Sequence, residues 1–193
     1  MRFMRSVGEW LFPPIAYFMA RSRIDRGSPP HSESDWTNRL NASTAGVAIA
    51  QEVYDSELNR LRGLEEKLRG LLNYGTIGIP FIAGIIGLAS RNERWWALGF
   101  GVFAGLELVG LFFLSVGGAE ARQLHQVVMD DLFEALEERV GVQFVVAAKR
   151  MVATELNVAA GLNLQNAVAV SAECLRRAAL WLGVAALLWL LCV

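Results

Sequence analysis

The chain has 193 residues, of which 54% are hydrophobic, and a formal net charge of −1. The mean hydropathy of +0.35 is high for a water-soluble domain, and the charged residues leave long uncharged blocks between them. This composition predicts an all-α integral membrane protein. It gives no argument for nucleic-acid binding, because no basic patch alternates with aromatic residues.

The first 24 residues resemble a signal sequence only in part. Arg2 and Arg5 precede an apolar run over residues 7–20, but Glu9 and Pro13 interrupt it, and no small-residue cleavage site follows. We expect residues 1–24 to form an uncleaved segment in the membrane interface; a loosely docked tail is the alternative. The aromatic residues that would anchor it are Trp10, Phe12, Tyr17 and Phe18.

A linker and an amphipathic helix are expected next. Residues 25–43 are rich in Ser, Pro and Asn, which is typical of a linker. From residue 44 to 70, apolar side chains recur every three or four positions and predict a cytosolic helix with one apolar face. These positions are Tyr54, Leu58, Leu61, Leu64 and Leu68.

Residues 71–116 predict a transmembrane hairpin. Two apolar stretches are separated by the four polar residues 91–94, and each is close to the roughly 20 residues that an α-helix needs to cross a bilayer. We expect Pro80 to kink the first arm, because proline cannot donate a backbone hydrogen bond. Thr76 lies in the same turn, where its hydroxyl is available to the freed carbonyl.

Small residues recur at four-residue spacing in both arms of the hairpin. Such stripes let helix backbones approach closely in lipid. They predict contact between the two arms, between protomers of a homo-oligomer, or both. The stripes are Ala83 and Gly87 in the first arm, and Ala97, Gly101 and Gly105 in the second.

Residues 117–177 predict further cytosolic helices, one over residues 119–140 and one over 142–177. The first carries an acidic stripe, interpreted as a solvated face or, alternatively, as a docking face for a basic partner. In the second, amides such as Asn157 and Asn163 are expected to fix the register between packed helices; binding of a small molecule is the alternative. Residues 178–193 carry no charge and predict a third span, or else a buried C-terminal helix.

The distribution of basic residues predicts the orientation. Seven lysines and arginines flank the spans on the side of the amphipathic helix, against two at the hairpin tip, which are Arg91 and Arg94. Under the positive-inside rule the helical stems then lie in the cytosol, as in a bacterial inner membrane. Trp95, Trp96 and Trp189 would meet at the outer interface.

Glu107 is the unusual residue of the second arm, because a charge at mid-membrane is costly and must face protein or water. Three interpretations are open. Protonated Glu107 could hydrogen-bond Thr76 or a backbone carbonyl. Repeated around an oligomer, it could line a cation-permeable path. A proton-carrier role would call for ionisable neighbours within the spans, and we find none there in the sequence.

No motif indicates an enzyme. The chain has no Gly-rich phosphate loop, no HExxH motif and no nucleophile elbow, so we expect no catalytic residues and no cofactor. His31 and His125 are far apart in sequence and Cys174 and Cys192 lie in or beside apolar helix, so we expect neither a metal site nor a disulfide framework.

The order of a cytosolic helix, a two-span hairpin and further helices resembles the SLATT group of small membrane effectors in bacterial nucleotide-signalling and anti-phage systems. The resemblance covers residues 52–120, with Glu52-Val53-Tyr54 and the segment 61–67 leading into the hairpin. It implies an oligomeric effector that forms or gates a pore when an upstream sensor signals. The alternative is a non-catalytic accessory subunit of a larger membrane complex.

Overall fold

A computed structural model describes Pro14, Tyr17 and residues 31–40, 44–91, 94–120 and 142–191, without the side chains of residues 44, 117–120 and 142. Within these residues there are four main helices and no strand, so the all-α prediction is confirmed for this part of the chain. The helices are α3 (Glu33–Leu40), α4 (Thr44–Arg91), α5 (Trp95–Glu120) and α7 (Val142–Leu191). The predicted acidic stripe and His125 lie outside the described residues.

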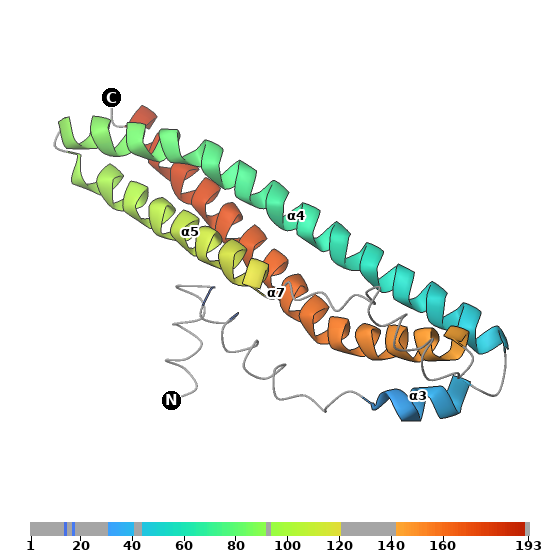
Figure 1. The fold of residues 1–193 in the computed structure, drawn as a ribbon. Coiled ribbons are helices and arrows are strands. Elements are labelled where there is room, and N and C mark those ends of the chain that lie inside the picture. The colour runs from blue at the N-terminus through green and yellow to red at the C-terminus, as the bar shows by residue number, and fades with distance from the viewer. Residues whose placement is uncertain are drawn as a thin grey trace.

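The three long helices form an elongated bundle. α4 and α7 lie side by side and run in the same direction, whereas α5 turns back from the end of α4 and packs against both (Figure 1). We call residues 71–91, 95–116 and 178–191 the hairpin end. We call residues 44–70 of α4 and 142–170 of α7 the stem. A backbone hydrogen bond from Arg94 N to Ala89 O, 3.0 Å long, closes the turn between α4 and α5.

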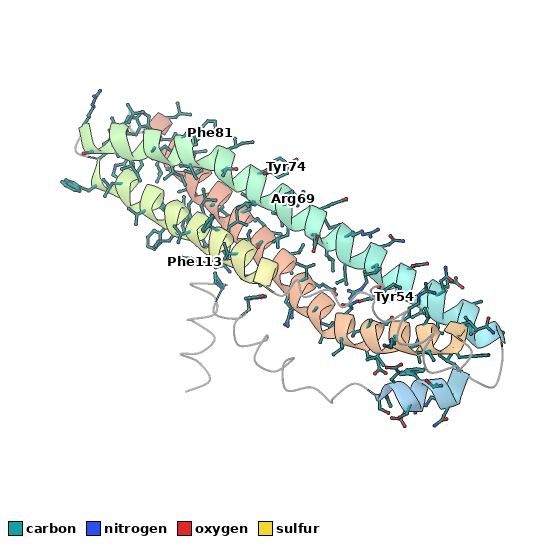
Figure 2. The ribbon with its side chains drawn as sticks, viewed as in Figure 1. Tyr54, Arg69, Tyr74, Phe81 and Phe113 are labelled. Atoms are coloured by element: carbon teal, nitrogen blue, oxygen red, sulfur yellow. The ribbon has the colours of Figure 1, made fainter. Side chains whose placement is uncertain are left out.

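The hairpin end exposes a broad apolar surface. α4, α5 and α7 are each long and apolar enough to cross a membrane, by length and composition. Figure 2 shows Tyr74 and Phe81 on the outer side of α4 and Phe113 on the outer side of α5, and all three are more than half exposed. In water such a patch would drive aggregation, whereas in lipid it is the expected outer surface. The chain is therefore a membrane protein.

Two predicted boundaries were wrong. α7 continues from the stem to Leu191 without a break, so residues 178–193 do not begin a separate helix. α5 likewise runs through Gly117 and Gly118 to Glu120, where the sequence analysis placed the end of one helix and the start of another. A glycine in a helix costs only about 1 kcal/mol relative to alanine, so the pair is not sufficient to end one.

The predicted linker over residues 25–43 contains a helix, α3, and in this respect the prediction was wrong. Ser32 and Asp35 cap the helix: Asp35 N donates to Ser32 Oγ and Ser32 N to Asp35 Oδ2, both at 3.2 Å. At the other end of α3, Leu40 is buried in a cluster with Ala50 of α4 and Ala147 of α7. Tertiary packing therefore holds a helix that its polar composition does not predict.

The buried side chains of the three long helices form separate clusters along the length of the bundle. In the stem, Leu61 and Leu68 of α4 pack against Leu164 of α7. Further toward the hairpin tip, α5 contributes Leu108, Leu111 and Leu114 to a second cluster, which also contains Cys174 of α7. Tyr17, one of the predicted interfacial anchors, is fully buried in this second cluster, whereas the other three anchors lie outside the described residues.

Candidate functional site

The candidate site is a charged cleft between α5 and α7. It begins with Glu107, which α5 directs toward α7, so that only 5% of the residue is exposed. The Cys174 side chain hydrogen-bonds this carboxylate, and Arg177 and Glu173 lie within electrostatic range of it. Glu107 is therefore surrounded by side chains of its own chain.

The expected hydrogen bond between Glu107 and Thr76 is not formed in this structure. Thr76 is exposed on α4, and its hydroxyl donates to the carbonyl oxygens of Leu72 at 3.0 Å and Asn73 at 2.7 Å. Threonine in a helix commonly makes such a bond to the preceding turn. Among the three interpretations of Glu107, the hydrogen-bonded structural group is nearest to this geometry, with Cys174 as the partner in place of Thr76.

Ion pairs along one face of α7 form the second part of the cleft. Arg176 binds Glu173 through Nε and Nη2, both at 2.9 Å, and Arg177 Nε reaches the same carboxylate at 2.8 Å. The Arg176 side chain is 76% exposed. Together with Glu107 these residues line a cleft of about 300 Å³, whose remaining walls are Phe103, Leu180 and Trp181.

The cleft lies deeper than the charges of α4. Arg69 is the last charged residue of α4 before its apolar stretch, and its neighbour Leu68 packs at the level of Leu164 and Val168 of α7. Arg177 lies nine residues beyond Val168, which at 1.5 Å per residue is about 13 Å further toward the hairpin tip. α7 therefore carries charges at a depth where α4 and most of α5 carry only apolar or small side chains.

The sequence analysis missed this arrangement. It identified Glu107 but found no ionisable neighbours for it within the spans, and it counted Arg176 and Arg177 among the seven basic residues that flank the spans. The alignment of α5 with α7 as antiparallel neighbours would have identified these residues. The Trp96–Trp189 ring pair, with centroids 6.4 Å apart, sets a register that brings residue 107 near residue 177.

The two predicted stripes of small residues have different surroundings. Ala97 and Gly101 are buried, and a Cβ at Gly101 would lie 2.9 Å from Cγ1 of Ile86, so this stripe packs between the arms. Gly105, the last member of the stripe, is 4.0 Å from Ile82 by the same measure. Ala83 and Gly87 are exposed, and the space around Gly87 is open to 4 Å.

Pro80 lies in the same part of α4, within a helix that continues past it to Arg91. Figure 2 shows the axis of α4 changing direction near Phe81. Toward the tip, Arg94 lies over the Trp189 ring, 4.5 Å from the centroid, so that a cation and an aromatic ring meet where the three helices end.

At the far end of the stem, a polar contact joins His31, just before α3, to Glu155 of α7. His31 N donates to Glu155 Oε2, and His31 Nδ1 lies 2.8 Å from Glu155 Oε1. Burial raises the pKa of Glu155, but the bonds from the His31 backbone and ring outweigh burial and bring the pKa below its usual value. The contact therefore depends on an ionised Glu155.

Comparison with protein families, with characterised proteins and with solved structures gave no match. Among the residues that the structure describes, no three His, Cys, Asp or Glu side chains are grouped so that they could hold a metal ion. The arrangement itself must therefore support any functional proposal.

Proposed function

We propose that this chain is an oligomeric membrane effector that forms or gates a pore in response to a cytosolic signal. The observation that carries the proposal is the continuity of α4 and α7, which each pass from the stem into the apolar hairpin end without interruption. A displacement of the stem would therefore reach the charged cleft through α7, which lines it, and the hairpin end through both helices. In this proposal the stem lies in the cytosol and the tip beyond the far side of a bacterial inner membrane.

The packing of the stem supports its proposed role in transmitting a displacement to the hairpin end. Leu61 and Leu68 are almost completely buried against α7, and the guanidinium of Arg60 lies over Gly161, where a Cβ would collide with it. Arg60 is itself held by Glu57 through Nε at 2.8 Å. Side chains packed in this way move together, because protein interiors are close-packed and transmit strain.

The open face of Ala83, Gly84 and Gly87 on α4 supports self-association. All three are exposed at a depth where the neighbouring outward side chains are large and apolar. Small residues on a lipid-facing helix allow a second helix to approach closely, and packing is what drives association in lipid. We propose that this face is the contact between protomers.

Reconstitution of the full chain tests the proposal. The purified protein should form a discrete oligomer in mild detergent and should release a trapped ion from liposomes. Gly70→Pro, placed between stem and hairpin end, should reduce the release, because proline removes a helical hydrogen bond and kinks the helix. Gly70→Ala is the matched control, since nothing lies within 4 Å of a Cβ at that position. A monomer that releases no ion at any protein-to-lipid ratio would contradict the proposal.

The second candidate is an accessory subunit of a larger membrane complex. The observation that favours it is the inward orientation of Glu107, because a carboxylate that faces its own α7 lines no path shared between protomers. An accessory subunit would remain monomeric when purified alone, and the outer apolar face would be covered by another protein's spans. The oligomeric state therefore separates the two candidates.

A further inference from the structure

We propose that the cleft between α5 and α7 binds the headgroup of a phospholipid that carries both a primary ammonium and a phosphate. This inference goes beyond the proposed pore, and it does not depend on oligomerisation. It rests on one carboxylate oxygen without a hydrogen-bond partner, on the charges of the cleft walls and on the apolar side chains that continue these walls toward the hairpin tip.

The first observation is an unsatisfied carboxylate oxygen. Among the described residues, Oε2 of Glu107 has no hydrogen-bond partner, although the residue is 95% buried and lines the cleft. A buried polar atom without a partner destabilises the protein, and the cost is greater if the group is charged. The cleft therefore favours a ligand with an N–H donor. A primary ammonium supplies three donors, whereas a quaternary choline nitrogen supplies none.

The second observation is the charge of the opposite wall. Arg176 and Arg177 share the single carboxylate of Glu173, which leaves one positive charge in excess among these three residues. With its carboxyl ionised, as the proposed ligand requires, Glu107 would balance this charge on the other wall. A zwitterionic ligand matches the arrangement, with its ammonium on Glu107 and its phosphate on the exposed guanidinium of Arg176. Basic pockets between transmembrane helices are known to hold lipid headgroups in this way.

The third observation is the apolar part of the cleft. Phe103 and Leu180, both more than half exposed, and Trp181 form the remaining walls. The Trp181 ring lies 5.7 Å from Phe103 and 5.8 Å from Phe100, so it is held in place between them. An amphiphile whose acyl chains lie along these rings would place its headgroup at the charges. A free phosphate would leave these walls without a partner.

The test measures which lipid remains on the protein. The full chain is incubated in detergent with equal amounts of phosphatidylethanolamine and phosphatidylcholine, and the retained lipid is counted by native mass spectrometry. We expect the wild type to prefer phosphatidylethanolamine on the order of tenfold, because a hydrogen bond to a charged group is typically worth 1.5–3 kcal/mol. Equal retention of the two lipids would overturn the proposal.

Single substitutions test the proposed contacts of the ammonium with Glu107 and of the phosphate with Arg176 separately. Glu107→Gln should reduce the preference for phosphatidylethanolamine, and Arg176→Gln should weaken retention of both lipids. Glu66→Gln and Arg91→Gln, which are exposed in the stem and near the tip, are the matched controls and should behave as wild type. The helical circular dichroism of each variant shows that it has folded. A preference that survives Glu107→Gln would overturn the proposal.

A third arm distinguishes lipid from a soluble anion. Inorganic phosphate at millimolar concentration should leave the bound phospholipid in place, because it gains nothing from the apolar walls. Displacement of the lipid by inorganic phosphate would overturn the proposal. The readout is made in detergent without ion flux, so its failure and the failure of the proposed pore are separate results.

Discussion

Gly101 of α5 lies directly against Ile86 of α4, so that a Cβ added to the glycine would stand 2.9 Å from the Cγ1 atom of Ile86. One residue further along α4 than Ile86, Gly87 faces open space on another side of the helix. The two glycines belong to stripes that look alike in the sequence. In the structure one stripe packs inside the bundle and the other is exposed.

We predict that Gly101→Val destabilises the bundle. The added side chain would overlap Ile86, and overpacking of a well-packed core typically lowers the free energy of unfolding by about 1–3 kcal/mol. The measurement is denaturant unfolding in detergent micelles. Gly99→Val is the control on the same helix, because nothing lies within 4 Å of a Cβ there. Equal stability of the two variants would argue against the close contact.

We predict that Gly87→Val weakens self-association without unfolding the chain. The valine has room within the protomer, but it would keep a second helix from the exposed face of α4. Cross-linking in liposomes measures the effect. Gly183→Val places the same bulk at an open, exposed position on α7 and should leave the oligomer intact. If both variants associate like the wild type, the contact between protomers lies elsewhere.

We predict that Glu155→Gln loosens α3 from the stem. The substitution removes the charge that accepts two bonds from His31, each 2.8 Å long. Because both side chains are partly exposed, we expect a loss of roughly 1 kcal/mol and about fivefold more frequent opening of α3. Limited proteolysis between α3 and α4 reports this opening. Glu52→Gln, on an exposed face of α4, should not change the cleavage rate.

The attachment of α3 should also weaken in acid. Hydrogen bonds from Ser32 lower the pKa of Asp35, and the contact with His31 lowers that of Glu155 against the effect of burial. Both carboxyls have a lower pKa in the folded chain than in the unfolded chain, so in their ionised form they stabilise the docked α3. This stabilisation is complete above the ordinary pKa values of 3.8 for Asp35 and 4.5 for Glu155. It is lost as the pH falls through the lower pKa values of the folded chain. The measurement is proteolysis by an acid-active protease between pH 5 and pH 2, with the intrinsic activity of the protease at each pH measured on an unstructured peptide. The corrected cleavage rate should rise as the pH falls, because α3 then opens more often. A pH-independent rate would show that these carboxyls do not hold α3.

The sequence was sufficient to locate the long helices. Uninterrupted apolar stretches and the four-residue polar tip correspond to the end of α4, the turn and α5. These features depend on neighbours within a few residues, which a single sequence displays. The division of α7 into two segments was wrong, because Arg176 and Arg177 change the polarity of the helix without ending it.

The cleft and α3 could not be predicted in the same way. Glu107 of α5 and Arg177 of α7 are 70 positions apart in sequence. They interact electrostatically only because the packing of the two antiparallel helices brings them close together. α3 has eight residues, fewer than an isolated helix needs, and it is held by Leu40 in a cluster with Ala50 and Ala147. Contacts between distant segments therefore determined the features that the sequence analysis missed.

The central claim is that the hairpin end crosses a bilayer, with the stem on one side and the tip on the other. Its most direct test is labelling by a membrane-impermeant maleimide in sealed liposomes. Single cysteines are introduced by Glu66→Cys in the stem and Arg91→Cys near the tip, after Cys174 and Cys192 have been replaced by serine. In vesicles with one protein orientation, only one of the two positions should react until detergent is added. Reaction of both positions in intact vesicles would contradict the account.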